Sequence, residues 1–481
     1  MPIKVTLLVL PLSRQALTYN KSTGKKQLSG PTPETADGRN IIESKAQLIS
    51  YFEEGFKPRE RWRIGTEHEK FPFLTDTLGP VPYRGARSIK ALLEGLRDRF
   101  GWTGVYEGEN IIALSDPNSM ANISLEPGGQ FELSGAPLTT VNDTCGEVTE
   151  HLAQVKTIGG ELGIGFLGLG ASPVWTRAEI PVMPKGRYAI MAPYMDKVGT
   201  LGRDMMFRTC TVQVNLDYSS EADMIKKLRV SLALQPLATA LFANSPFLEG
   251  KPNGYLSFRS HVWEDTDNAR AGMLPFAFED GFGFERFVEY ALDVPMYFVL
   301  RNGKFVNCTG GSFRNFLNGR LPQLPGEIPT MRDFADHLTT IFPEVRLKRY
   351  LEMRGCDVGL GPMQCAMPAL WAGLLYDEGS LEEAWELVKP ATAEQRQNLR
   401  HDVPKLGLKA QFMGRSLQDI AKQVLTLARA GLKSRGFGEE AFLDVLDEIA
   451  ESGITQADGL LKLYHGLWKG DISNVFKVAA F

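Results

Sequence analysis

The sequence predicts an α+β fold in which an antiparallel sheet forms the body and helices form the C-terminal region. Several segments alternate polar and apolar residues as strands do, and the stretches between them lack regular helix crossovers. From about residue 381 onward, apolar residues recur at helical spacing. We expect residues 1–40 to be a mobile N-terminal arm, residues 41–380 the body, and residues 381–481 helices packed on that body within one domain.

Composition excludes several classes of protein. The 481 residues are 43% hydrophobic and 23% charged, which is ordinary for a folded chain. A net charge of −4 gives no footprint for binding nucleic acid or an anionic membrane, and no apolar run approaches the roughly 20 residues of a membrane span. Five cysteines in so long a chain indicate a reducing compartment, so we expect a cytoplasmic protein.

The first residues leave several readings open. Met1 to Leu12 has a short apolar core but no clear cleavage site, which favours an edge strand or a loose arm over a signal peptide. Residues 13 to about 40 are rich in Ser, Thr, Gly, Pro and Lys. This segment is a real arm, a remnant of a targeting segment or a misassigned start.

The first strong strand runs from Ile64 to Phe73. Side chains alternate across a strand, so Glu67 and Glu69 share one face at roughly 6–7 Å. Two carboxylates this close repel unless water or a cation intervenes, and Mg²⁺ prefers oxygen ligands. Glu-x-Glu is also common on solvated strand faces, so the pair indicates a metal site only if later strands repeat the pattern.

The remaining elements follow from periodicity and turn residues. Helices are predicted over 41–56 and 88–100, then after a cap at Asn142 or Asp143, and from Ser220 to about residue 244 with an interruption near Pro236. Strands are predicted at 122–134, with a turn or bulge at its Pro-Gly-Gly, at 208–217 and at 347–354. Residues 255–270 read as a functional loop, and the C-terminal helices centre on residues 417–427, 442–449 and 460–463.

One sheet face collects acids and amides. It is expected to carry Glu67, Glu69, Glu126, Gln130, Glu132, Gln213, Asn215, Glu352 and Arg354. A plain solvated face would carry Lys, Thr and charges of both signs. This set instead indicates a concave, wet site that holds two or three divalent cations, which in turn bind a polyphosphate.

The sequence contains no Walker A motif and no glycine-rich loop between a strand and a helix, so a nucleotide would be bound mainly through metal. The basic residues that could reach phosphate or carboxylate are Lys185, Arg187, Arg259, Arg270 and Arg354. Each is also readable as a surface charge. Arg354 is favoured for function because it follows Glu352 by two residues on a strand.

Five segments resemble glutamate–cysteine ligases of the plant and proteobacterial type. They are IGTEHEKF (64–71), SLEPGGQFELSGAP (124–137), MPKGRY (183–188), RTCTVQVNLD (208–217) and YLEMRG (350–355). The resemblance runs from about residue 41 to the C-terminus. It implies a glutamine synthetase-like fold, a curved antiparallel sheet that forms a cup surrounded by helices.

The resemblance also implies a reaction. The γ-carboxylate of L-glutamate attacks Mg²⁺-ATP to give γ-glutamyl phosphate, and the amine of L-cysteine displaces phosphate, in the first step of glutathione synthesis. Implied Mg²⁺ ligands are Glu67, Glu69, Glu126, Glu132 and Glu352. Implied nucleotide or substrate contacts are Gln130, Gln213, Asn215, Trp263 and Tyr188. Arg354 would hold glutamate or the phosphoryl group, with Lys185 and Arg187 near phosphate or carboxylate, while Arg259, Trp263 and Arg270 help close the site.

In the plant enzymes of this family, a reversible cysteine pair is linked to a switch between monomer and dimer. The matching positions here are Cys145 and Cys365, so a redox-linked homodimer is implied, although two buried thiols are an equal reading. The second plant pair would join Cys308 to a position that holds Gln323, so that bridge is not expected. His68 points away from the glutamates and is expected to be a core or second-layer residue.

Three alternatives remain open: a ligase of the same chemistry with another acceptor amine, a metal-dependent hydrolase, and a non-catalytic homologue. ATP dependence separates the first from the second. The intact set of acidic and basic positions argues against the third.

Overall fold

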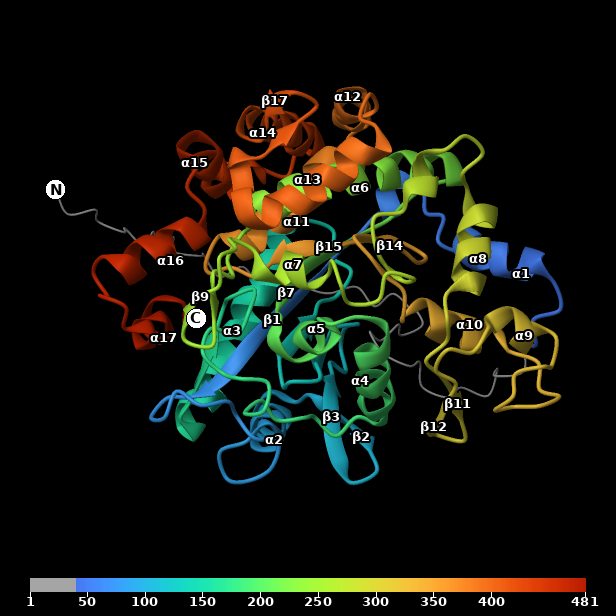
Figure 1. The fold of residues 1–481 in the computed structure, drawn as a ribbon, viewed down its shortest axis with the longest axis horizontal. Helices are drawn as coiled ribbons and strands as arrows, with labels where there is room; N and C mark the ends of the chain where they lie inside the picture. The colour runs from blue at the N-terminus through green and yellow to red at the C-terminus, as the bar shows by residue number, and fades with distance from the viewer. Residues whose placement is uncertain (1–39) are drawn as a thin grey trace.

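The computed structural model describes residues 40–481 (Figure 1). The predicted N-terminal arm and its edge strand fall outside the described residues. The body is a nine-stranded sheet with the order β14-β15-β7-β1-β5-β4-β3-β2, and β6 lies beside the second half of β1. Every strand pair in this sheet is antiparallel, which confirms the predicted α+β class.

The strands of the main sheet, from one edge to the other, are β14 (Val345–Leu347), β15 (Leu351–Asp357), β7 (Thr211–Leu216), β1 (Ile64–Leu74), β5 (Phe131–Ser134), β4 (Asn122–Leu125), β3 (Asn110–Ser115), β2 (Thr103–Glu107) and the off-path β6 (Ile164–Leu167). Four further pairs are two-stranded: β8 (Phe247–Leu248) with β9 (Lys251–Pro252), β10 (Ala271–Gly272) with β13 (Phe342–Pro343), β11 (Phe298–Arg301) with β12 (Lys304–Asn307), and β16 (Gln411–Phe412) with β17 (Arg415–Ser416).

Helices cover the sheet and build the C-terminal region. They are α1 (Lys45–Glu53), α2 (Ile89–Phe100), α3 (Val141–Leu162), α4 (Gly186–Val198), α5 (Gly202–Arg208), α6 (Glu221–Leu241), α7 (Phe258–Val262), α8 (Phe284–Asp293), α9 (Phe313–Leu317), α10 (Met331–Leu338), α11 (Met363–Leu375), α12 (Glu378–Val388), α13 (Ala393–Leu406), α14 (Leu417–Arg435), α15 (Asp444–Ser452), α16 (Gln456–His465) and α17 (Val475–Val478). No described helix is long and apolar enough to cross a bilayer.

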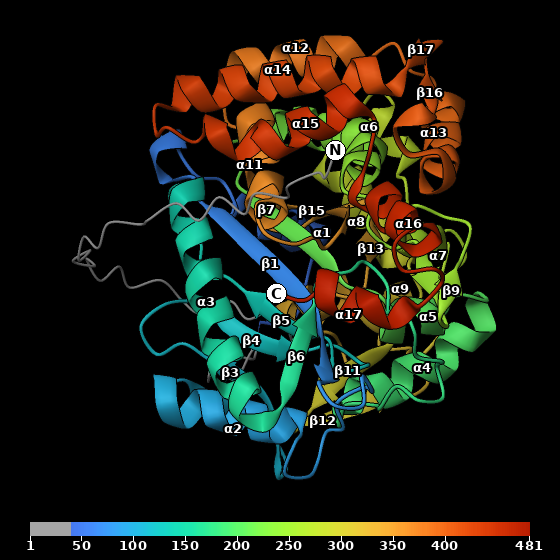
Figure 2. The same cartoon turned by 90° about the vertical axis from the view of Figure 1, so that its left-hand side faces the viewer.

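The apolar sheet face lies on two hydrophobic clusters. The β7 residues Val212 and Val214 belong to the larger cluster, which also takes in α6, α11 and α14. The β5 residues Phe131 and Leu133 belong to the second cluster, with α2 and α3. Figure 2 shows α3 running alongside the sheet and the C-terminal helices capping its end. Because the larger cluster is continuous from α1 to α15, the C-terminal helices share the core of the body.

Local predictions differ from the structure in four places. Thr140, not Asn142 or Asp143, caps α3, and Asp143 completes a capping box with it. The helix after Ser220 runs unbroken through Pro236, since a proline removes only one backbone bond and this segment is fully packed. The 208–217 strand begins only at Thr211, after α5. The 347–354 strand is a hairpin, β14 and β15, joined through residues 348–350.

Candidate active site

A pocket of about 90 Å³ opens beside the polar face of the sheet. Its lining side chains come from β1, the β4–β5 turn, α4, α5, β7, α7 and β15, segments far apart in the sequence. Of the predicted site residues it contains Glu69, Glu126, Gln130, Arg187, Tyr188, Arg259, Trp263 and Arg354. The expectation that this face is wet is wrong for most of its acids and amides, which are buried.

Glu67 lies on β1 directly beside the two amides predicted to share its face. The register pairs Glu67 with Gln213, and both amides donate to its carboxylate: Gln213 Nε2 at 2.9 Å and Asn215 Nδ2 at 3.0 Å. Burial, followed by the charges of Glu352 and Glu132, raises the pKa of Glu67 to about 7. The site therefore holds Glu67 in an environment that disfavours its anion unless a cation arrives.

Glu69 and Glu132 face each other across β1 and β5. The Thr211 backbone N–H donates to Glu69 at 2.9 Å, and the hydroxyls of Ser124 and Ser134 donate to Glu132 at 2.7 and 2.8 Å. Burial raises the pKa of both carboxyls, and the nearby Glu126 raises it further. Four crowded carboxyl groups, supplied mainly with neutral donors, form an oxygen-rich environment of the kind that suits a hard cation.

Glu352 has a different environment from the other acids. Arg346 binds both of its oxygens, at 2.5 and 2.9 Å, and Arg354 and Lys348 bind at 2.9 and 3.3 Å. Burial alone would raise its pKa, but Arg346, Lys348 and Arg354 outweigh burial and hold the pKa of Glu352 well below its usual value. In this structure Glu352 is the counter-ion of three cations.

Sequence reasoning missed Arg346 and Lys348. Treating residues 347–354 as one strand hid the hairpin, in which Arg346 pairs with Glu352 across β14 and β15. The sequence signal that could have revealed the hairpin was the polar Lys348-Arg349-Tyr350 turn, with the charged residues Arg346 and Glu352 at matching positions on its two sides.

The arginines of the pocket carry unused donors. Arg259 Nη2 donates to the Arg354 carbonyl at 2.9 Å, while Arg259 Nη1 and Arg187 Nε are buried and bond no acceptor among the described residues. A buried guanidinium N–H without a partner is unfavourable, and an incoming carboxylate or phosphate oxygen would satisfy it. Trp263 follows the last residue of α7 and lines the same pocket.

Other predicted residues brace the pocket walls. Lys185 and Tyr188 both donate to the Leu125 carbonyl, at 2.7 and 2.6 Å, and burial lowers the pKa of Lys185 to about 8. The amide nitrogen of Gln130 donates to Met206 and Thr209 carbonyls, which ties the β4–β5 turn to the end of α5.

The structure does not bring Arg270 to this pocket. Arg270 is fully buried, pairs with Asp267 at 2.6 Å and stacks on Tyr297, so its contacts are those of a core ion pair. His68 lies on the apolar side of β1, as expected, beside the buried pair formed by Lys70 and His151 at 2.9 Å. Burial and Lys70 lower the pKa of His68 to about 3, so it stays neutral.

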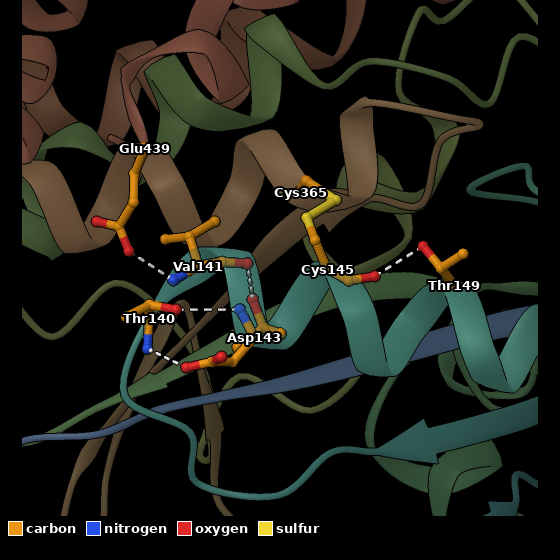
Figure 3. The surroundings of a disulfide bond; sticks show 8 residues. Thr140, Val141, Asp143, Cys145, Thr149, Cys365 and Glu439 are labelled. Carbon is orange, nitrogen blue, oxygen red and sulfur yellow. Dashed lines mark hydrogen bonds between the residues drawn. A yellow bond between two sulfur atoms is a disulfide. The ribbon is translucent and has the colours of Figure 1, made fainter. Parts of the chain in front are cut away.

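Cys145 in the first turns of α3 and Cys365 in α11 are joined by a disulfide, with Cα atoms 5.6 Å apart (Figure 3). Both cysteines are half-buried. Beside them, Glu439 accepts from the Val141 N–H at 2.6 Å, which holds the start of α3 to the C-terminal helices. Cys210, Cys308 and Cys356 are buried thiols.

Comparisons with known proteins address the family. The model of glutamate–cysteine ligase family 2 matches residues 63–478. The chain is 57% identical over 454 residues to glutamate–cysteine ligase B, chloroplastic, of Oryza sativa subsp. japonica, a match that covers 94% of this chain and 90% of that protein. It is 58% identical over 456 residues to the chloroplastic enzyme of Solanum lycopersicum, which covers 94% and 86%.

A solved structure extends the comparison to the fold. Glutamate–cysteine ligase from Francisella tularensis, crystallised with AMP, superposes with a TM-score of 0.54 over 88% of each chain at 13% identity, which shows the shared fold. The plant relatives are named chloroplastic, and this finding overturns the cytoplasmic location predicted from the sequence. The match over residues 63–478 and the identities above show that the chain belongs to glutamate–cysteine ligase family 2.

Proposed function

We propose that the protein joins the γ-carboxylate of L-glutamate to the amine of L-cysteine in the pocket beside Glu69, Arg259 and Arg354, with ATP as cosubstrate. Formation of γ-glutamylcysteine is the first step of glutathione synthesis. Membership of the family and 56–58% identity to three plant ligases over more than nine-tenths of the chain support this reaction.

The observation that carries the site assignment is that two half-buried acids, Glu69 and Glu126, and arginines with unused donors line one pocket. Attack of the γ-carboxylate on ATP and the later attack of the amine on γ-glutamyl phosphate both build negative charge on oxygen. Arg187 and Arg259 present buried N–H donors that have no acceptor within residues 40–481, and Arg354 lines the same pocket. We assign the first two to the substrate carboxylate and Arg354 to the carboxylate or the phosphoryl group, because fixed donors stabilise such charge without reorganising.

The acids of this sheet face fit Mg²⁺, and two of them, Glu69 and Glu126, line the pocket. Glu67, Glu69, Glu126 and Glu132 supply oxygen donors, and burial together with the neighbouring carboxylates raises the pKa of Glu67, Glu69 and Glu132. No three His, Cys, Asp or Glu side chains within residues 40–481 form a preassembled metal group. Mg²⁺ in nucleotide sites takes one or two carboxylates plus phosphate and water, so these acids would hold it together with ATP. When bound, it would supply positive charge to the phosphates.

The structure suggests different roles for three predicted site residues. Gln213 and Asn215, expected to contact nucleotide or substrate, donate to Glu67 and so orient an acid of the site. Glu352, expected to bind Mg²⁺, would do so only in exchange for one of its present cationic partners. The names of the plant relatives support a plastid location for this chain.

Phosphate release tests the reaction. The protein is incubated with Mg²⁺-ATP and glutamate, with and without cysteine, and with 2-aminobutyrate in place of cysteine. We expect strong dependence on both glutamate and cysteine. Release with the other amine alone would keep the mechanism and change the acceptor. Release that needs neither glutamate nor any amine would indicate hydrolysis of ATP, and no release under any condition would overturn the proposed ligase.

We also propose that the Cys145–Cys365 disulfide controls a monomer–dimer equilibrium. Dithiothreitol is expected to change the elution volume of the wild-type protein in gel filtration, and Cys145→Ser is expected to abolish that change because the variant has no bond to reduce. Cys308→Ser is the matched control: it removes a buried thiol that forms no bridge, so the dithiothreitol effect should persist. An effect of unchanged size in Cys145→Ser would clear this disulfide of the role.

A further inference from the structure

Asp357, the last residue of β15, is a fully buried carboxylate that does not line the pocket. Its Oδ2 accepts from the Asn244 N–H at 2.8 Å and from the Ser245 hydroxyl at 2.6 Å, and its Oδ1 accepts from the Ser257 hydroxyl at 2.9 Å. All three donors are neutral. Burying an anion that is hydrogen-bonded only by neutral groups costs free energy unless a nearby positive charge offsets it.

The two serines that donate to Asp357 hold the first turn of α7. A hydroxyl that donates its proton keeps lone pairs with which it accepts. The Ser257 hydroxyl accepts from the Ser260 N–H at 3.2 Å and caps α7, and the Ser245 hydroxyl accepts from the Arg259 N–H at 3.2 Å. One carboxylate therefore fixes the orientation of both hydroxyls that bind the backbone of this helix.

α7 is a helix of five residues, too short to be stable by itself. It carries Arg259, and Trp263 follows it; both side chains line the pocket. Among the described residues, the Arg259 side chain makes one hydrogen bond, from Nη2 to the Arg354 carbonyl, so its placement depends on the backbone that carries it. Burial raises the pKa of Asp357, and the positive charge of Arg259 acts in the opposite direction, so the two buried charges compensate each other.

We propose that Asp357 is a positioning residue for the ligase: through Ser245 and Ser257 it fixes α7 and thereby aims the Arg259 guanidinium at the substrate carboxylate. This inference rests on the proposed function, in which Arg259 binds glutamate. Asparagine cannot keep all three bonds, because its single oxygen accepts at most two and its amide nitrogen can bond a serine hydroxyl only if that hydrogen bond reverses its direction. Loss of these bonds would let α7 shift, and a shift of about 1 Å in a binding group is enough to reduce catalysis markedly.

The test compares Asp357→Asn and the milder Ser257→Ala with wild type. We expect the KM for glutamate to rise about tenfold in Asp357→Asn, with the KM for ATP within about twofold, because about 1.4 kcal/mol of lost binding is a factor of ten. The matched control is Asp217→Asn. Asp217 is also a buried acid with bonds to a backbone N–H and a lysine, but it follows the opposite end of β7, so its loss should leave both KM values unchanged.

A double-mutant cycle with Arg259→Ala separates positioning from general damage. If Asp357 acts through Arg259, the change in glutamate KM caused by Asp357→Asn disappears in the Arg259→Ala background. The positioning role is overturned if Asp357→Asn changes the glutamate KM equally in both backgrounds. It is also overturned if neither Asp357→Asn nor Ser257→Ala changes the glutamate KM. Where Asp357→Asn does not fold, Ser257→Ala decides in the same cycle. A normal glutamate KM in Arg259→Ala itself would instead overturn the binding role proposed for Arg259.

Discussion

Glu67→Gln is expected to lower kcat about 10²- to 10³-fold, the range seen when one group that stabilises transition-state charge is removed. The same variant is expected to be more stable than wild type in EDTA at pH 8. The pKa of Glu67 is about 7 in the folded protein and 4.5 in the unfolded chain, so its contribution to stability is fully present below pH 4.5 and is lost as the pH rises through 7. Glutamine does not ionise and escapes this loss.

The expected gain in the free energy of unfolding at pH 8 is on the order of 3 kcal/mol, from the size of the shift in the pKa. The new amide has partners within reach, since Gln213 Oε1 and Asn215 Oδ1 are buried without a donor among the described residues, and either amide can flip to accept. Urea unfolding at pH 5 and pH 8 in EDTA measures the effect, which should be much larger at the higher pH.

The matched control for Glu67→Gln is Glu109→Gln, which makes the same chemical change at an exposed acid. It should change neither kcat nor stability at either pH. Near-full kcat in Glu67→Gln would remove Glu67 from the reaction. Equal destabilisation at pH 5 and pH 8 would show that burial of its charge is not the controlling factor.

Glu352→Gln is expected to have the largest effect on stability, a loss of about 3–5 kcal/mol at pH 7, because it leaves buried cations without their anion. Arg346, Lys348 and Arg354 all bind this carboxylate. The folded pKa of Glu352 lies well below 4.5, so its contribution is fully present above pH 4.5 and is lost as the pH falls through the folded value. The difference between wild type and variant should therefore shrink in acid.

Activity should fall with stability in Glu352→Gln, since Arg354 lines the pocket and depends on Glu352 for its position. The control is Glu54→Gln. Glu54 is an exposed partner of Arg349, which lies in the turn of the same hairpin, so its loss should change stability by less than about 1 kcal/mol. Urea midpoints at pH 7 and at about pH 3, together with kcat at pH 7, provide the comparison, because the contribution of Glu352 is lost only below pH 4.5. A variant as stable as wild type at pH 7 would contradict the counter-ion role.

Much of the site could be predicted from parity along strands. Glu67, Glu69 and Glu132 share one face because strand side chains alternate, and β1 and β5 do pair so that Glu69 meets Glu132. The alternation of side chains along a strand does not show how deeply a strand face is buried. Nothing in the local pattern shows that α4, α5 and α7 cover this face and bury it. Prediction from this alternation also failed where one predicted strand is a hairpin, and for this reason it missed Arg346 and Lys348.

The sequence by itself determined the α+β class, the polar face of the central strands, the helical C-terminal region and the family, because these depend on local periodicity and long specific motifs. Only the tertiary structure decided which charges share an environment. It placed Arg270 in a core ion pair, surrounded Glu352 with cations, and put Asp357 beneath the helix that carries Arg259. The contacts of Asp357 with Ser245 and Ser257 span 112 and 100 residues of the chain. Such contacts are set by packing, which leaves no periodic signal along the sequence.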